Sequence, residues 1–369
     1  MRYRRMPIEV ESPEELGYGT IANNLAESSF SDQRLSDLGV ESDVGDLLLQ
    51  YGDHRGLPAL RELIAGTELD PADLLVTAGA AAALFIVATS LLQHGDHVLI
   101  VRPNYATNVE TPRAIGADAE FLDLRFEDGW RLDPDRVAAA LRPETRLVSV
   151  CVPHNPTGRT MDLGDLVALV ERHPTARLLV DETYRELAYD APAPQAATLS
   201  ERVIAVSSLS KAYGLPGLRI GWIACRDRAL TERFLAAREQ ILIAGSLLDE
   251  TMAARVLARR DAVLPGILDA VRRRRAIVAD WFAAQEHFEW HPPEAGVVCF
   301  PRLRPERGAD PGVFYDALLQ RHGTYVGPGH WFEQDRRCFR LGFGWPDDDQ
   351  LRRGLDGLVA AARAAEPAG

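Results

Sequence analysis

Residues 203–219 read VIAVSSLSKAYGLPGLR, and this stretch carries the strongest chemical signal in the chain. Residues 203–206 are apolar and mostly β-branched, which predicts a short buried strand. Small hydroxyl side chains, a lysine (Lys211) and a loop rich in glycine and proline follow it. Arg219, further along the same loop, can hold a phosphate dianion through two parallel hydrogen bonds. The stretch therefore predicts an amine and phosphate ligands at the end of one strand.

Lys211 also stands out against the composition of the chain. The sequence has 41 lysine and arginine residues, and Lys211 is the only lysine among them. Arginine stays protonated, whereas a partly desolvated lysine can lose its proton and form an imine with an aldehyde. A bias that replaces lysine by arginine wherever only charge is needed leaves Lys211 as a candidate nucleophile, rather than a surface lysine retained by chance.

Other apolar runs end in polar clusters. Asp181, Glu182, Thr183 and Tyr184 follow RLLV, and a carboxylate there can pair with a pyridinium nitrogen. Asn155, in HNPTG, offers an amide to a ring hydroxyl, and Tyr105 can stack on a ring face. Residues 79–81 (Gly79, Ala80, Ala81) open an alanine-rich helix whose free N–H groups can receive a phosphate. Each has an ordinary alternative, such as a helix cap for Asp181 or a core position for Tyr105, but their succession favours one site.

The alternation of elements predicts an α/β fold. Predicted strands occupy residues 74–77, 97–101, 147–152, 178–180 and 203–206, with helical segments such as 133–141 and 163–172 between them. Fully apolar strands that alternate with helices predict a mostly parallel sheet covered on both faces, with ligands at the carboxyl ends of the strands. A helical stretch follows at about 228–285, and 286–369 predict a smaller α+β lobe with strands at VVCFP and FRLGF and a closing helix at 347–365.

Composition limits the class of protein. The formal net charge of −13 argues against nucleic acid and anionic membranes as partners. The four cysteines form no CxxC pair, which favours a reduced, cytoplasmic protein without a disulfide framework or a metal site. The N-terminus lacks the apolar segment of a signal peptide. Residues 74–92 carry no charge and are long enough for a membrane span, but we interpret them as a strand and a helix separated at Gly79.

Together these motifs resemble the class I/II aminotransferase family of fold-type I pyridoxal 5'-phosphate (PLP) enzymes, across essentially the whole chain. SLSKAYGLPGLRIGW resembles the family's lysine signature, HNPTG its asparagine turn and DETY its aspartate–tyrosine strand. Residues 51–64, VGPGHWF (326–332) and FRLGF (339–343) also match. The resemblance implies an aspartate aminotransferase-like fold in three parts: an N-terminal segment over the active site and small domain (1–40), a large PLP-binding domain (41–265) and a small C-terminal domain (266–369). It also implies a homodimer with shared active sites.

The resemblance implies roles for individual residues. Lys211 carries the imine, Asp181 binds the pyridine nitrogen, and Arg340 with Asn155 binds the substrate α-carboxylate. The remaining cofactor ligands implied are Asn155 and Tyr184 at the ring oxygen, Ser208, Ser210 and Arg219 at the phosphate, Gly79, Ala80 and Ala81 at the helix start, Tyr105 over the ring, and Tyr51 from the partner subunit. One departure is that the phosphate loop, GAAA, has no hydroxyl or polar side chain. Backbone N–H groups and Ser208 must then contribute more, and cofactor affinity could be lower.

The motifs do not separate the reactions that such a site supports. After Lys211 removes the α-proton, transamination, elimination with re-addition, and oxidation use the same residues. The Lys211 loop and the overall layout are similar to capreomycidine synthase-type enzymes, which implies elimination of the hydroxyl of a β-hydroxylated arginine and closure of the guanidine nitrogen onto Cβ, in antibiotic biosynthesis. Glu27, in IANNLAESS (21–29), can pair with a guanidinium, although it is equally compatible with a helix cap or an exposed acid.

We therefore expect a PLP-dependent cyclase of a β-hydroxylated arginine, with an aminotransferase of an α-amino acid as the alternative. The substrate side chain and the stereochemistry stay open at this point. The acid that protonates the departing hydroxyl also stays open among His154, His330 and Glu27.

Overall fold

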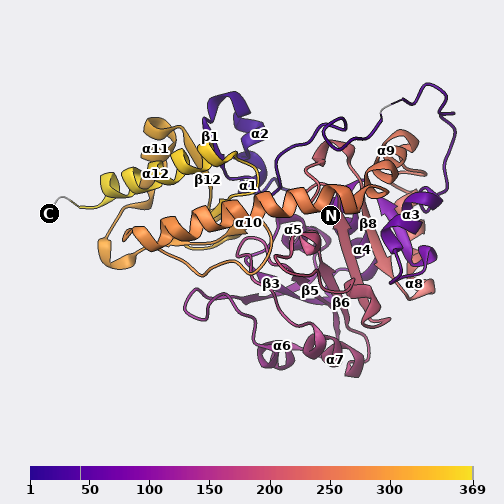
Figure 1. The fold of residues 1–369 in the computed structure, drawn as a ribbon. Helices are drawn as coiled ribbons and strands as arrows, with labels where there is room; N and C mark the ends of the chain where they lie inside the picture. The colour runs from indigo at the N-terminus through magenta and orange to yellow at the C-terminus, as the bar shows by residue number, and fades with distance from the viewer. Residues whose placement is uncertain (42, 368–369) are drawn as a thin grey trace.

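The computed structural model describes residues 1–41 and 43–367, which form a larger and a smaller body (Figure 1). The larger body is built on a seven-stranded sheet in the order β2-β8-β7-β6-β5-β3-β4. β8 is antiparallel to both of its neighbours, and the remaining pairs are parallel. The mostly parallel α/β sheet is thus confirmed. Its strands are β2 (Leu74–Thr77), β3 (His97–Arg102), β4 (Asp118–Asp123), β5 (Thr145–Cys151), β6 (Arg177–Asp181), β7 (Val203–Ser208) and β8 (Gly221–Cys225).

The central strands are apolar because both faces of the sheet are covered. All residues of β7 are buried. Val203 and Ala205 belong to one hydrophobic cluster, whereas Ile204 and Val206 belong to the other. This is the period-two alternation of a strand, with an apolar layer on each side.

Helices supply those two layers. On one face α4 packs against α5, α8 and the sheet, and the other face is covered by α3, α6, α7 and α9. Among the described helices none is long and apolar enough to cross a membrane, and the alanine-rich α4 is a core helix instead. The bounds are α3 (Pro58–Ala65), α4 (Gly79–Leu91), α5 (Ala106–Ile115), α6 (Pro134–Ala140), α7 (Gly164–Arg172), α8 (Arg228–Glu239) and α9 (Leu247–Leu257).

The smaller body joins the two ends of the chain. Its four-stranded sheet has the order β1-β12-β13-β10, and the N-terminal β1 lies parallel to β12. Figure 1 accordingly shows the indigo N-terminal segment beside the orange and yellow C-terminal elements. The elements are α1 (Pro7–Val10), α2 (Pro13–Leu16), β1 (Asn23–Leu25), α10 (Arg260–Ala284), β9 (Phe288–Glu289), β10 (Val298–Cys299), β11 (Arg302–Leu303), α11 (Pro311–His322), β12 (Thr324–Pro328), β13 (Phe339–Gly342) and α12 (Asp348–Ala365).

The helical stretch expected over about 228–285 consists of three helices, α8, α9 and α10. The long α10 links the two bodies and contains Pro265, so the predicted domain boundary at 265/266 falls inside a helix (Figure 1). The domain limits themselves stay a prediction. The sequence pattern did not anticipate α5, β4 or β8; β4 lies at the sheet edge and is only partly buried, so it lacks a fully apolar run.

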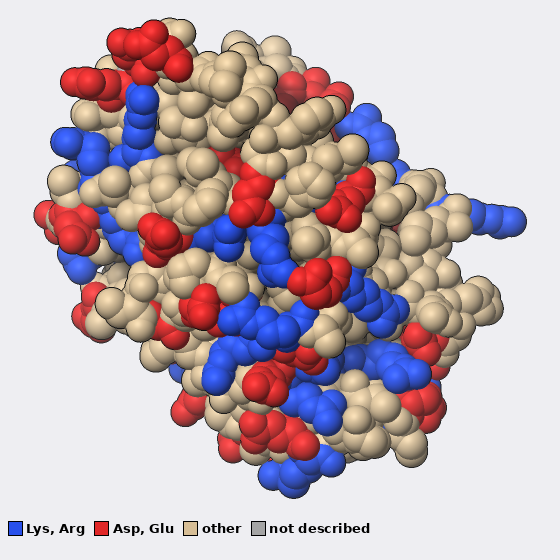
Figure 2. Space-filling view, turned by 90° about the vertical axis from the view of Figure 1, so that its right-hand side faces the viewer, with Lys and Arg blue, Asp and Glu red and all other residues tan. Residues whose placement is uncertain are grey.

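Charged side chains of both signs are interspersed on the face shown in Figure 2. Surface ion pairs are common in the structure, such as Arg142 with Asp118 at 2.8 Å and Arg131 with Glu294 at 2.6 Å. Exposed pairs of this kind contribute about 0–1 kcal/mol each. The surface arginines therefore pair with the more numerous acidic residues, but these pairs contribute little to the free energy of unfolding.

Candidate active site

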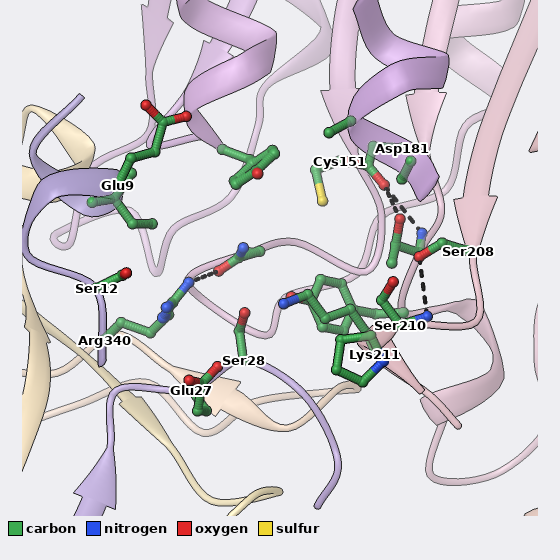
Figure 3. A pocket seen from close by; sticks show the side chains of 18 of the residues that line it. Glu9, Ser12, Glu27, Ser28, Cys151, Asp181, Ser208, Ser210, Lys211 and Arg340 are labelled. Atoms are coloured by element: carbon green, nitrogen blue, oxygen red, sulfur yellow. Dashed lines mark hydrogen bonds between the residues drawn. The ribbon is translucent and has the colours of Figure 1, made fainter. Parts of the chain in front are cut away.

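A cavity of about 400 Å³ lies where the carboxyl ends of the large-body strands meet the small body and the N-terminal segment. The structure brings most of the predicted site residues to its wall. These are Glu27, Ala80, Ala81, Tyr105, Asn155, Asp181, Tyr184, Ser208, Ser210, Lys211, Arg219 and Arg340. Figure 3 shows Asp181 at one end, Arg340 and Glu27 at the other, and Lys211 between them.

The phosphate end is shaped by close backbone packing at the start of α4. Gly79 has a φ of +80°, and a Cβ there would lie 2.4 Å from a guanidinium nitrogen of Arg219. Glycine is therefore required for Arg219 to lie against the helix start. The Arg219 guanidinium donates to the carbonyl of Pro216 at 2.8 Å, which orients it. The free N–H groups of α4 and this guanidinium together form an anion site.

Ser208 and Ser210 complete that end of the cavity. They lie at and just after the end of β7, and the backbone N–H of Ser210 donates to Ser208 Oγ at 3.3 Å. Both side chains are buried, yet both reach the cavity. Because Ala80 and Ala81 bring no hydroxyl, these two serines supply the hydroxyl donors that the helix start lacks.

Asp181 lies at the end of β6 with its carboxylate buried. Thr183 donates to Oδ1 through its hydroxyl at 2.6 Å and through its N–H at 3.2 Å. Burial nevertheless raises the pKa of Asp181, while the hydrogen bonds from Thr183 and the charge of Lys211 oppose that shift. A buried carboxylate that is only partly compensated favours a cationic partner, such as a protonated pyridine nitrogen.

Two polar groups beside the cavity have unused hydrogen-bonding capacity. Within the described chain, the buried Tyr184 hydroxyl and Arg340 Nε have no hydrogen-bond partner. Buried polar groups are rarely left unpaired, so each indicates a group of the ligand that binds here. Tyr184 is suited to a ring oxygen and Arg340 to a carboxylate.

Arg340 is held at the small-body end by strand β13. Its Nη1 donates to Asn155 Oδ1 at 3.2 Å and its Nη2 to the carbonyl of Ala26 at 2.6 Å. The guanidinium also lies 5.3 Å from the ring of Phe332. These contacts fix one orientation of a group that binds carboxylates in a bidentate manner.

Lys211 is enclosed between these two ends. Burial lowers the pKa of its amine, whereas the neighbouring Glu27 carboxylate raises it and Arg340 lowers it further. A lowered pKa increases the fraction of neutral amine, which is the form that attacks a carbonyl and accepts a proton. The environment therefore suits a lysine that acts as a nucleophile and base.

Several wall residues were not predicted. The short helices α1 and α2 bring Glu9, Ser12 and Glu14 to the cavity, and Trp331 contributes from the small body. The carboxylate of Glu11 ties this segment down, because it accepts hydrogen bonds from His330 and Trp331 at 2.8 Å each. The acidic run ESPEE (11–15) was the available signal. An exposed acidic run is common, so it did not by itself indicate a cavity.

Two predicted cofactor residues do not line the cavity. Gly79 lies behind Arg219, where it acts by leaving space. Tyr51 is 82% exposed and lies outside the cavity wall of its own chain. Its predicted role in a partner subunit's site therefore stays a prediction.

Comparison with known proteins places this geometry in a family. The family model for aminotransferase class I and II matches residues 33–358. Capreomycidine synthase of Streptomyces vinaceus is 34% identical over 323 residues, covering 85% of this chain and 81% of the relative. An arginine–pyruvate transaminase of Pseudomonas aeruginosa is 32% identical over 294 residues, covering 76% and 74%.

Two solved structures of PLP-dependent enzymes also align with this chain. A PLP-dependent aminotransferase from Streptococcus suis aligns with a TM-score of 0.91 at 28% identity, over the full length of both chains. The PLP-dependent cyclase OrfR aligns with a TM-score of 0.86 at 32% identity, over 98% of each chain.

The residues present fit PLP as the cofactor. Arg219, Ser208, Ser210 and the start of α4 suit its phosphate, the buried Asp181 suits its pyridine nitrogen, and the unpaired Tyr184 hydroxyl suits its ring oxygen. Lys211 is the sole lysine and lies among them. The chain belongs to the class I and II aminotransferase family of PLP-dependent enzymes.

Proposed function

We propose that this enzyme is a cyclase of a β-hydroxylated arginine, in which water leaves from Cβ and a guanidine nitrogen closes onto that carbon to form a capreomycidine-type ring for antibiotic biosynthesis. The observation that carries the proposal is the acidic wall opposite the phosphate end. Glu9, Glu14 and Glu27 all face the cavity there. Carboxylates beside the substrate side chain favour a guanidinium over the acidic or apolar side chains of other amino acids.

The groups of the cavity wall then bind different parts of one substrate. Arg340, held by Asn155, binds the α-carboxylate, and Glu14 with Glu27 faces the guanidinium. When bound, PLP supplies the electron sink that makes the Cα–H bond acidic. Lys211, between Asp181 and the end that Arg340 and Glu27 share, accepts the α-proton.

The relatives support this side-chain class. One relative is a capreomycidine synthase, another is named as an arginine–pyruvate transaminase, and OrfR is a cyclase. The similarity to an arginine–pyruvate transaminase also supports a second candidate function, that of an aminotransferase. An aminotransferase of arginine would use the same acidic wall and the same Arg340.

We propose in addition that the enzyme is a homodimer. Tyr51 and nearby Leu48 and Leu49 are exposed, as are residues 241–243 on the loop after α8. The two stretches lie close together, because His54 contacts Glu239 at 2.6 Å. The resemblance of residues 51–64 to the family's early segment implies that Tyr51 of such a second copy reaches the cofactor phosphate.

The test is a product assay on purified, PLP-loaded enzyme without any keto acid. Arginine and then a 3-hydroxylated arginine are added, and products are identified by mass and by chromatography. The proposal expects many turnovers of the hydroxylated substrate to a product that has lost one water. Conversion limited to one equivalent per active site, and restored by pyruvate, would contradict it and identify an aminotransferase.

A further inference from the structure

We propose that Glu27 is a catalytic residue of this cyclisation, which gives a proton to the departing Cβ hydroxyl and takes one back from the guanidinium nitrogen that replaces it. The inference rests on the proposed function and deepens it. Glu27 follows β1 and faces the cavity beside Lys211 and Arg340 (Figure 3). It therefore lies at the substrate side of the lysine, where Cβ and its side chain extend.

The positions of His154 and His330 argue against either histidine as the acid that protonates the departing hydroxyl. His154 Nδ1 contacts Thr157 Oγ1 at 2.8 Å, and the ring is buried away from the cavity wall. Burial lowers the pKa of His154 to about 4, so it is neutral at pH 7. His330 contacts Glu11 at 2.8 Å and does not line the cavity either. Neither ring lines the cavity in which the substrate would lie.

The other acids of the cavity are held by hydrogen bonds to the protein or are exposed. Asp181 is held by Thr183 at the pyridine end, and Glu9 accepts the backbone N–H of Met6 at 3.0 Å. Glu14 is exposed, at a position where its carboxylate can face the guanidinium. Glu27 is the half-buried carboxyl between these groups.

The surroundings of Glu27 favour a proton on its carboxyl. Burial is the largest effect and raises its pKa, and the nearby charge of Glu14 raises it further. Lys211, Arg340 and a hydrogen bond from the Tyr18 hydroxyl lower it, but the balance is a raised pKa. A carboxyl that holds its proton closer to neutral pH can act as a general acid.

Tyr18 is the positioning residue. Its hydroxyl lies 3.3 Å from Glu27 Oε1, and its ring stacks on Trp345 with centroids 5.8 Å apart. The stack fixes the ring, and the hydroxyl then holds one oxygen of Glu27. The other oxygen, Oε2, is left for the substrate.

The proton balance closes on two residues of this chain. Lys211 takes the α-proton, the electrons of the Cα–H bond form the Cα–Cβ double bond, and the Cβ–O bond breaks as Glu27 protonates the oxygen to give water. A guanidinium nitrogen then bonds to Cβ and returns a proton to Glu27, while Lys211 returns a proton to Cα. The substrate loses one water in total, and both residues regain their starting protonation.

The Glu27 carboxyl can make both proton transfers because the guanidinium nitrogen bonds to Cβ, the same carbon that the hydroxyl oxygen leaves. This predicts that Glu27 acts on Cβ chemistry and not on the α-proton. Substitution at Glu27 must therefore separate the two activities, which a purely structural role would not do.

The experiment compares wild type, Glu27→Gln, Glu27→Asp and Glu15→Gln. Glu15 is an exposed acid on α2 paired with Arg5 at 2.7 Å, outside the cavity wall, and controls for charge on the same segment. Two rates are measured with PLP-loaded enzyme: formation of the dehydrated product from 3-hydroxyarginine, and exchange of the arginine α-proton for deuterium in D₂O. The dissociation constant of arginine is measured by calorimetry.

For Glu27→Gln we expect product formation to fall about 100-fold or more, with α-proton exchange within about threefold of wild type and partial recovery in Glu27→Asp. The wild-type rate should fall as pH rises and Glu27 loses its proton, and Glu14→Gln should move that fall to lower pH. Equal losses of exchange and product, or an arginine dissociation constant that rises as much as product formation falls, would overturn the role. Absence of dehydrated product with wild type would instead overturn the proposed function.

Discussion

At the residue scale, burial decides which side chains of this enzyme are chemically active. Lys211 has a lowered pKa because its amine is enclosed, and Asp181 and Glu27 have raised pKa values for the same reason. In each case charged neighbours oppose part of the effect of burial. The cavity therefore holds a base that is more readily neutral and acids that are more readily protonated than their exposed counterparts.

Glu182 allows the effect of burial on a carboxyl pKa to be tested at a residue with no proposed catalytic role. It is buried beside Asp181 and accepts the N–H of Ala196 at 2.9 Å, and burial raises its pKa to about 7. Because the folded state holds this proton more tightly than the unfolded state, stability falls as pH rises from about 4.3 towards 7. Glu182→Gln keeps an acceptor for Ala196 but cannot ionise.

We expect Glu182→Gln to match wild type near pH 4.5 and to exceed it by about 1–3 kcal/mol at pH 8. Denaturant unfolding of both proteins at the two pH values measures the difference. Glu171→Gln, an exposed acid on α7, controls for removal of one negative charge. A constant difference across pH would show that the pKa of Glu182 is the same in the folded and unfolded states, and would contradict the raised pKa.

At the element scale, helix α4 combines a core role with a binding role. Its alanine-rich sequence packs against the sheet and two helices, while its first turn faces the cavity through Ala80 and Ala81. The helix dipole and free N–H groups attract a phosphate, but the side chains add no hydrogen bond. A serine introduced into this turn would supply the hydroxyl that the wild-type sequence lacks.

We expect Ala81→Ser to tighten PLP binding by about fivefold, since one added hydrogen bond contributes about 1 kcal/mol. The dissociation constant of PLP, measured by titration of apoenzyme, tests this. Ala82→Ser is the matched control, because Ala82 is on the same helix but does not line the cavity. An equal effect of the two serines would contradict a phosphate contact at Ala81.

At the scale of the whole molecule, the site is assembled from both ends of the chain. The pairing of β1 with β12 brings residues 23–25 against 324–326, and this places Glu27 and Arg340 at one end of the cavity. The N-terminal helices then close the wall through Glu11. The cavity is consequently sensitive to the relative placement of the two bodies.

A proposed second copy adds a further level of assembly. We expect Ile241→Glu, which places a charge in an exposed apolar loop, to convert a dimer into monomers and to weaken PLP binding. Tyr51→Phe should keep the dimer and weaken PLP binding by about three- to tenfold, the loss of one hydrogen bond. Sedimentation velocity and PLP titration test the pair, and a monomeric wild type would contradict the shared site.

The sequence by itself determined the parallel sheet and the chemistry at its strand ends. Strands such as 203–206 are continuous apolar runs because both faces are buried, and residues just beyond them meet at one edge because the strands are parallel. That is why Lys211, Asp181, Asn155 and Arg219 could be predicted as one site from local pattern. The cofactor was implied by the family resemblance that the same residues carry.

Only the tertiary structure decided the substrate end of the cavity. Glu9 and Glu14 lie on short helices without a buried repeat, and Ser12 caps the second of them. This segment reaches the wall because Glu11 binds side chains more than 300 residues away. The choice of Glu27 over His154 and His330 likewise depends on which groups face the cavity. Contacts between distant segments leave no periodicity in the sequence, because they arise from packing of completed elements.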